Sequence, residues 1–148
     1  MSSLTLARLE DIDRLEPLVA AFHTFAGIES TEEGRSKALV PLLEGTPHGV
    51  AYLIGPRRAP VGYIVISFGY SLELGGIDGF IDEFYIREKV RGRGMGSEVL
   101  LTLLPALSEH GVKALHLEVD RDNERARRLY QRAGFEPREK YHLMTRVA

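Results

Sequence analysis

The run Val90–Ser97 places glycine at every second position, at residues 92, 94 and 96. Glycine lets backbone N–H groups approach a ligand closely, and the amphipathic helix pattern that follows would present unpaired N–H groups and the positive end of its dipole. A plain strand-to-helix turn needs only one such glycine, and each further glycine has an entropic cost. We therefore predict a pyrophosphate-binding loop formed by Arg91, Gly92, Arg93, Gly94, Met95, Gly96 and Ser97.

Two common nucleotide motifs do not account for this loop. A P-loop ends in Gly-Lys-Ser/Thr, whereas here Gly96 and Ser97 follow Met95 without a lysine. The dinucleotide fingerprint G-x-G-x-x-G fails on spacing, because counting from Gly92 puts Ser97 in the last place. The loop therefore belongs to neither class.

Two spaced motifs together resemble those of one family. The loop fits R-x-x-G-x-G, and the later segment Asn123–Phe135 fits N-x-x-A-x-x-L/F-Y-x-x-x-G-F at every named position. On these residues the chain resembles the GNAT superfamily of acyl-CoA-dependent N-acyltransferases, most clearly from about Gly79 to Phe135. The matching residues are Arg91, Gly94 and Gly96 in the first motif, and Asn123, Ala126, Leu129, Tyr130, Gly134 and Phe135 in the second.

The resemblance implies a binding site for acetyl-CoA, the acyl donor. Main-chain amides of the glycine loop would wrap its pyrophosphate, and its pantetheine arm would pair like an extra strand with Phe84, Tyr85 and Ile86. Asn123 and Ala126 are implied neighbours of the same donor, and Asn123 also suits a helix N-cap. No metal is implied, and the five histidines show no metal-like spacing.

Tyr130 has two interpretations. It shares a helical face with Ala126 and Ala133, which suits a half-buried core aromatic. By the resemblance it is the tyrosine that protonates the departing CoA thiolate. A phenol suits that task because its reference pKa of about 10 lies not far above the thiol value of roughly 8.5.

Asp82 and Glu83 are adjacent acids on the predicted strand Phe80–Ile86. Neighbouring strand residues point to opposite faces, so at most one should enter a shared cleft. A carboxylate there would take the proton of an amine acceptor, directly or through water, and attract a cationic substrate. The diamine-acetylating branch, which includes spermidine and thialysine acetyltransferases, often carries the two acids in reverse order, so the branch and the base stay open. We favour Glu83 for its longer reach.

The expected reaction is transfer of an acetyl group from acetyl-CoA to a primary amine, by direct attack in a ternary complex. A small-molecule acceptor is favoured. A protein amine, another acyl donor and a non-catalytic acyl-CoA sensor are the alternatives. The front half of the chain should shape the acceptor pocket, with walls drawn from Phe22, His23, Phe25, Tyr70, Ser71 and Glu73.

Composition and charge agree with a small soluble enzyme. The 148 residues suit a single N-acetyltransferase domain, 1–148, and the formal net charge of −2 argues against nucleic-acid binding. The absence of cysteine excludes disulfides and thiolate zinc sites, and no apolar run has the length of a membrane span. We expect a cytoplasmic protein, and whether it forms a homodimer stays open.

Hydrophobic periodicity predicts an α/β (α+β) fold, with a mixed, mostly antiparallel twisted sheet of six to seven strands and about four helices. Strands are expected near residues 4–9, 50–54, 61–68, 80–86, 115–119 and 141–147. We expect Asp11 or Asp13 to cap the first helix, Ser30 or Thr31 the second, and Gly134 to close the last. Pro41 should weaken the second helix, and Pro105 should kink or end the third.

Overall fold

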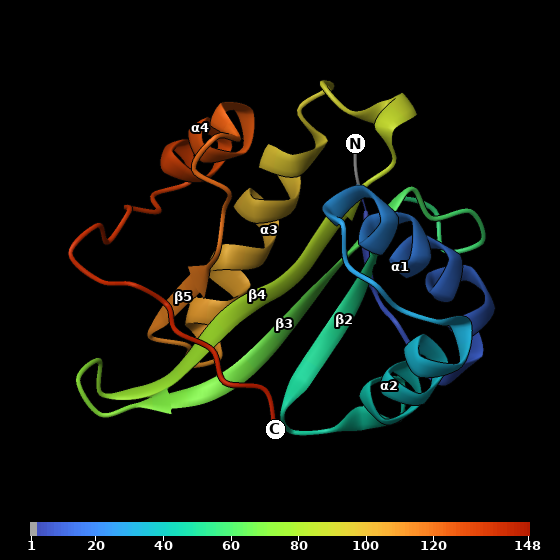
Figure 1. Ribbon diagram of the computed structural model, residues 1–148, viewed down its shortest axis with the longest axis horizontal. Helices are drawn as coiled ribbons and strands as arrows, with labels where there is room; N and C mark the ends of the chain where they lie inside the picture. The colour runs from blue at the N-terminus through green and yellow to red at the C-terminus, as the bar shows by residue number, and fades with distance from the viewer. Residues whose placement is uncertain (1–2) are drawn as a thin grey trace. The chain divides into compact units, whose positions relative to one another are not determined.

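The computed structural model of the chain describes residues 3–148 (Figure 1). It divides into two compact units, with the boundary between Glu118 and Val119. In chain order the first unit contains β1 (Leu4–Leu6), α1 (Ile12–Ala26), α2 (Glu32–Gly45), β2 (Gly49–Ile54), β3 (Gly62–Ser71), β4 (Gly76–Ile86), α3 (Met95–Glu109) and β5 (Ala114–Leu117), with short 3-10 turns at Leu9–Asp11 and Glu88–Val90. The second unit contains α4 (Glu124–Arg132) and the C-terminal segment.

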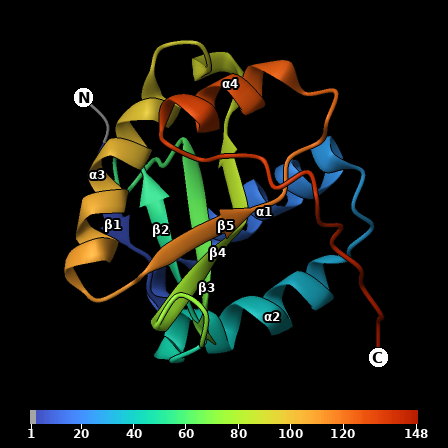
Figure 2. The same ribbon diagram turned by 90° about the vertical axis from the view of Figure 1, so that its left-hand side faces the viewer.

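The sheet has the order β1-β2-β3-β4-β5, and its first four strands are antiparallel. Only β5 runs parallel to its neighbour, and Figure 2 shows it alongside β4. The β2–β3 hairpin that turn residues 55–60 predict is present. The mixed, mostly antiparallel sheet is therefore confirmed.

The prediction of six to seven strands is wrong, because the sheet within residues 3–148 contains five. Residues 141–147, whose apolar alternation predicted a final strand, form no strand. The N–H of Tyr141 instead bonds back to the carbonyl of Arg138 at 3.0 Å, and the cations of Arg138 and Lys140 lie over the Tyr141 ring. A strand needs a partner for its backbone groups, and side-chain alternation does not supply one.

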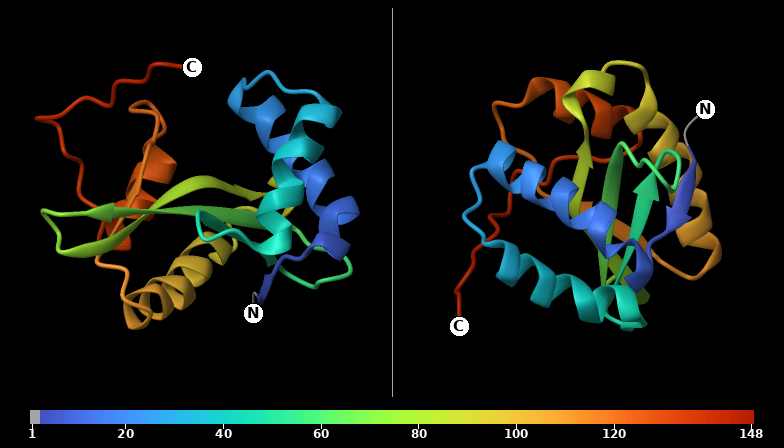
Figure 3. Two further views of the ribbon diagram at one scale, coloured as in Figure 1. Left: turned by 90° about the horizontal axis from the view of Figure 1, so that it is seen from below. Right: turned by 90° about the vertical axis from the view of Figure 1, so that its right-hand side faces the viewer.

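Helices cover both faces of the sheet within the first unit. Figure 3 shows α1 and α2 on one face and α3 on the opposite face. Toward α1 and α2 the strands direct Leu53 and Tyr63, which join one buried cluster with Leu15 and Leu18. The alternate strand residues Ile54, Ile64 and Ile66 are also buried, as are the α3 residues Val99, Leu100, Leu103 and Leu107. Burial of both faces is what makes the sheet a rigid support.

The prolines do not interrupt their helices. α2 continues through Pro41 to Gly45, and α3 continues through Pro105 to Glu109, so the expected break at Pro105 is absent. Proline at position 105 deprives the carbonyl of Leu101 of its helical partner. Leu101 is 72% exposed, so water can satisfy that carbonyl.

Local caps follow the sequence at α2 and α4. The Thr31 hydroxyl accepts a hydrogen bond from the Gly34 N–H at 3.0 Å, so Thr31 is the cap and Ser30 is not. Asn123 caps α4, and Gly134 follows that helix with a φ of 99°. These signals are reliable because they depend on neighbouring residues only.

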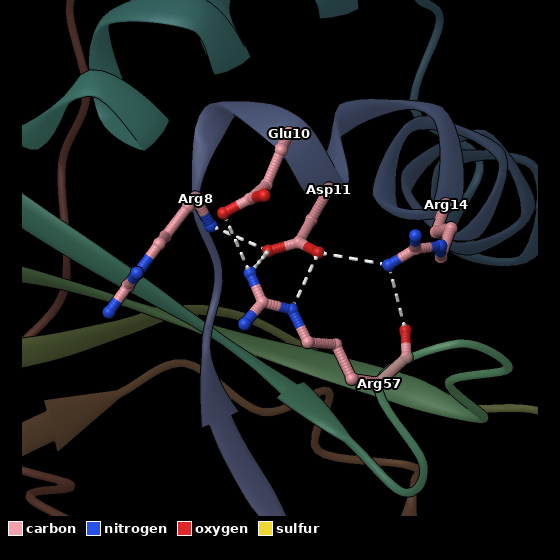
Figure 4. A network of polar contacts seen from close by, with 5 residues as sticks. All are labelled: Arg8, Glu10, Asp11, Arg14 and Arg57. Atoms are coloured by element: carbon pink, nitrogen blue, oxygen red, sulfur yellow. Dashed lines mark hydrogen bonds and ion pairs between the residues drawn. The ribbon is translucent and has the colours of Figure 1, made fainter.

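Asp11 occupies the N-cap position of α1, but its side chain makes no capping hydrogen bond to that helix (Figure 4). Its buried carboxylate accepts hydrogen bonds from the Arg8 N–H at 2.9 Å, from Arg14 at 3.0 Å, and from two nitrogens of Arg57 at 3.0 Å each. Burial alone would raise the pKa of Asp11, but the bonds from Arg57 and Arg8 and the nearby positive charges lower it. The contact fastens the β2–β3 loop, which carries Arg57, to the start of α1.

No helix within residues 3–148 is long and apolar enough to cross a membrane.

Candidate functional site

Strand β4 is paired on both sides only over part of its length. It pairs with β3 from Gly76 to Ile86, but with β5 only from Asp78 to Ile81. Within residues 3–148, the β5-side edge of residues 82–86 therefore has no strand partner. Such an edge presents N–H and C=O groups to which an extended ligand can add. Phe84, Tyr85 and Ile86, the residues predicted to pair with the donor, lie on this stretch.

A β-bulge lies where the β4–β5 pairing ends. Val65 faces Glu83 and Ile66 faces Ile81, so Asp82 has no partner in the register. A bulge interrupts the alternation of side chains, and the simple expectation that adjacent acids occupy opposite faces does not apply here. Partial desolvation of the Asp82 carboxyl, together with the charge of Glu83, raises the pKa of Asp82.

Glu83 is the carboxylate at the centre of the site. The Tyr63 hydroxyl donates to its Oε1 at 2.6 Å, and His23 Nε2 lies 2.7 Å from its Oε2. The side chains of Glu83 and His23 are 18% and 14% exposed. Desolvation and the charge of Glu83 raise the pKa of Tyr63, so its hydroxyl remains a donor at neutral pH. Glu83 is thus held by two donors while part of it still meets solvent.

Aromatic rings line the same region. The centroids of Phe22, Tyr63 and Tyr85 lie between 5.9 and 6.4 Å from one another. Phe22 and His23 of α1 therefore do reach the candidate site. Tyr70, by contrast, pairs with Ile77 near the far end of the β3–β4 hairpin, seven residues or about 23 Å along the strand from Tyr63. The expected walls Tyr70, Ser71 and Glu73 lie away from Glu83.

The glycine loop leads into the N-terminus of α3. Gly92 and Gly94 have φ values of 81° and 76°, and Gly94 is the N-cap residue without a side-chain cap. None of the N–H groups of residues 92–97 donates to another residue in the described part of the chain. Free amides at a helix N-terminus form a site for an anion such as a phosphate group.

The two loop arginines behave differently. Arg93 is exposed. Arg91 turns back instead: its Nε donates to the Ile86 carbonyl at 2.7 Å, and its guanidinium lies 4.6 Å from the Phe25 ring centroid and 5.3 Å from that of Tyr85. The Arg91 side chain therefore anchors the loop to β4 and α1, and the groups that face solvent in the loop are the main-chain amides and the Arg93 side chain.

The second unit carries the remaining predicted residues. The Asn123 side chain accepts a hydrogen bond from the Ala126 N–H at 3.1 Å, which confirms the cap at that position. Tyr130 is half-buried, with its ring edge-on to Phe135 at 5.8 Å. Burial raises the pKa of Tyr130 to about 12, so the phenol is protonated at neutral pH and can donate a proton.

The sequence analysis did not predict Tyr63 and Ser30 as residues of the site. Tyr63 belongs to an apolar strand pattern, and Ser30 resembled a helix cap. Their partners are 20 and 7 residues away, and no local spacing indicates such pairs. Within residues 3–148, no group of three or more His, Cys, Asp or Glu side chains is placed to hold a metal ion.

Comparison with known sequences and structures agrees with this geometry. The family described as "Acetyltransferase (GNAT) family" matches residues 14–135. A spermine/spermidine N(1)-acetyltransferase of Bacillus subtilis (strain 168) is 38% identical over 58 residues, which cover 38% of this chain and 38% of that protein. The match thus spans well under half of the relative.

Solved structures share the fold over nearly the whole chain. An integron cassette protein from the mobile metagenome of Cole Harbour Salt Marsh is 32% identical, with a TM-score of 0.85 over 98% of this chain and 90% of that one. A predicted acetyltransferase with acetyl-CoA from Clostridium acetobutylicum is 18% identical, with a TM-score of 0.79 over 98% and 96% of the two chains. At that identity the likeness concerns the fold alone.

Proposed function

Because the chain belongs to the GNAT family of acetyltransferases, we propose that it transfers the acetyl group of acetyl-CoA to a primary amine of a small molecule. The transfer occurs by direct attack within a ternary complex. The observation that carries this proposal is Glu83, a partly exposed carboxylate held by two donors on the stretch of β4 that has no β5 partner. That is where a general base and an extended donor can meet.

Acetyl-CoA is the substrate that the loop and the strand edge fit. Its pyrophosphate accepts hydrogen bonds from the main-chain amides between Arg91 and Ser97, at the N-terminus of α3. Its pantetheine arm adds to the edge of β4 along residues 84–86, where a backbone N–H then stabilises the oxyanion that forms. Asn123 and Ala126 contribute from the start of α4.

Glu83 acts as the general base. A primary amine is protonated near neutral pH, so it must lose a proton before its lone pair can attack the thioester carbon. Glu83 takes that proton, directly or through water, and the new C–N bond forms as the carbonyl oxygen becomes an oxyanion. The oxyanion then reforms the carbonyl as the C–S bond breaks and the thiolate leaves, and the nitrogen releases its second proton to solvent to give the neutral amide. Asp82 adds negative charge beside the same site and attracts the cationic acceptor.

Tyr130 acts as the general acid that protonates the departing thiolate. Its pKa of about 12 means that it carries its proton at neutral pH, and it regains that proton from solvent after each turnover. The same group also packs against Phe135, so the catalytic and packing roles are compatible.

The surroundings of Glu83 favour a small cationic acceptor. Aromatic rings of Phe22, Tyr63 and Tyr85 suit an alkyl chain or an ammonium group, and two carboxylates supply negative charge. The name of the B. subtilis relative, a spermine/spermidine N(1)-acetyltransferase, points to the same class of acceptor. Polyamines and diamines are therefore the first acceptors to test.

The test is release of free thiol from acetyl-CoA in the presence of a panel of amines. The chain has no cysteine, so the protein contributes no thiol background. We expect turnover with diamines or polyamines, and a lower turnover but unchanged acetyl-CoA affinity for Tyr130→Phe. Binding of acetyl-CoA without thiol release from any amine would contradict the proposal and favour an acyl-CoA sensor. Turnover of lysine peptides alone would replace the small acceptor with a protein amine.

A further inference from the structure

We propose that His23 is a positioning residue that holds the Glu83 carboxylate in the orientation needed for proton removal, an inference that rests on the proposed function. The two residues lie 60 positions apart, on α1 and β4, and their side chains meet at 2.7 Å. Nothing in the motifs of the chain indicates this pair.

The hydrogen bonds around His23 have one consistent direction. Arg35 Nη1 donates to the Ser30 hydroxyl oxygen at 2.9 Å, so the hydroxyl hydrogen is free to donate to His23 Nδ1 at 2.7 Å. The ring hydrogen then resides on Nε2, which donates to Glu83 Oε2. Each hydrogen bond in this series is donated toward the carboxylate, because an ionised Glu83 can only accept hydrogen bonds.

Arg35, the first donor in this series of hydrogen bonds, is itself held in place. Arg35 also donates from Nε to Glu16 at 2.8 Å and from Nη1 to the Ser30 carbonyl at 3.1 Å. The Arg35 and Glu16 side chains are only 14% and 16% exposed. Arg35 thus holds Ser30, and Ser30 restricts the rotation of the His23 imidazole. A fixed donor of this kind is what a base needs to keep one geometry.

The groups that face the pair come from four elements. Glu83 and Asp82 lie on β4, Tyr63 on β3, Arg35 on α2, and Glu16 on α1. Tyr63 and His23 each donate to a different oxygen of Glu83. Each oxygen keeps a further acceptor position, because a carboxylate has about four. His23 therefore supports the base without occupying all of its proton-accepting capacity.

Two isosteric substitutions separate this role from simple packing. The amide nitrogen of glutamine can replace the donor at Nε2, whereas asparagine reaches only as far as Nδ1. We expect His23→Asn to lower kcat about 10- to 100-fold, the usual weight of a hydrogen bond to a charged group, with the KM for acetyl-CoA unchanged. We expect His23→Gln to recover most of the loss. The acidic limb of the pH profile should move to higher pH in His23→Asn and return in His23→Gln.

Ser30→Ala provides a milder variant that leaves both Glu83 and His23 in place. It removes the hydroxyl that orients the imidazole, so we expect a loss of a few-fold in kcat and a smaller shift of the same limb. Circular dichroism melting curves of all three variants show whether each one is folded.

The outcomes distinguish this inference from the proposed function. Wild-type rates in His23→Asn, with Glu83→Gln inactive, would overturn the role of His23 and leave the acetyltransferase proposal intact. Equal losses in His23→Asn and His23→Gln, with an unmoved pH profile, would show a packing role and overturn it too. Absence of thiol release by the wild-type protein would instead overturn the proposed function itself.

Discussion

Asp11 and Glu83 are both carboxylates at the centre of polar networks, but their surroundings differ in charge and exposure. Asp11 is 0% exposed and accepts four hydrogen bonds, three of them from arginine side chains (Figure 4). The Glu83 side chain is 18% exposed and accepts from a tyrosine and a histidine. Its chain neighbour Asp82 adds a second negative charge.

The difference in charge and exposure suits Asp11 to a structural role and suits Glu83 to the proposed role of general base. Against the effect of burial, the hydrogen bonds from Arg57 and Arg8 and the charges of Arg57 and Arg14 lower the pKa of Asp11, so its carboxylate stays ionised at neutral pH. The donors to Glu83 carry no permanent charge, and solvent or a substrate can still reach it. A network that saturates its acid stabilises the fold, whereas one that leaves capacity can support catalysis.

Glu83→Gln is expected to lower kcat more than any other substitution in this comparison. It keeps the size of the side chain but removes the base, so kcat should fall by about 10²- to 10⁴-fold, the usual weight of general base catalysis. The melting temperature and the acetyl-CoA dissociation constant should change little. Thiol-release kinetics and calorimetry measure both. Asp82→Asn is the matched control, and a larger loss in that variant would transfer the role of base to Asp82.

Asp11→Asn should show the opposite pattern. It removes the negative charge that Arg57 and Arg14 share, although Arg57 keeps its ion pair with Glu10, and we expect the free energy of unfolding to fall by about 2–3 kcal/mol. That is less than the roughly 3–5 kcal/mol of a fully buried broken pair, because the two arginines are 37% and 40% exposed and can be hydrated. Urea unfolding measures the change, with Glu10→Gln as an exposed control of small effect. A loss of kcat per folded molecule would contradict the division of roles.

The acid dependence of stability should also separate the two networks. The pKa of Asp11 lies below its ordinary value of 3.8 in the folded protein, so its contribution is present above about that pH. The contribution is lost as the pH falls through the folded-state pKa. Unfolding curves between about pH 2 and pH 6 should therefore converge for wild type and Asp11→Asn at the acid end. Parallel curves throughout would exclude a titrating Asp11.

Among Glu83→Gln, Asp11→Asn and Tyr63→Phe, the last should have the smallest effect. The ring remains packed against Phe22 and Tyr85, and only the bond to Glu83 Oε1 is lost. We expect a decrease in kcat of about tenfold, and about 1 kcal/mol of stability, as for one hydrogen bond. Kinetics and urea unfolding measure the two changes. An effect as large as that of Glu83→Gln would show that Tyr63 does more than hold the base.

Local signals in the sequence predicted much of the fold and the donor site. The glycine loop, the caps at Thr31 and Asn123, and the close of α4 at Gly134 all depend on residues a few positions apart. Such short-range patterns carry their own geometry, because the hydrogen bonds that they imply close within one turn. Asp82 and Glu83 could be predicted as candidate acids for the same reason, because they are adjacent in the sequence.

Other features needed the folded chain. Adjacent acids suggested opposite faces, but the bulge at Asp82 arises from the register of β3 against β4. The alternation at residues 141–147 suggested a strand that found no partner. The sequence placed Arg91 in the glycine loop, but only the fold shows that its side chain bonds to Ile86 and lies over Phe25. In each case the deciding contact lies outside the local window.

The sequence by itself determined the family, the glycine loop and the pair of acids, because motif spacing and helix-end chemistry are properties of neighbouring residues. Only the tertiary structure decided which carboxylate is held by Tyr63 and His23, residues 20 and 60 positions away in the chain. The physical reason is that hydrogen bonds across packed elements depend on strand register and helix placement. Those arrangements are fixed by burial of the whole core rather than by any one segment.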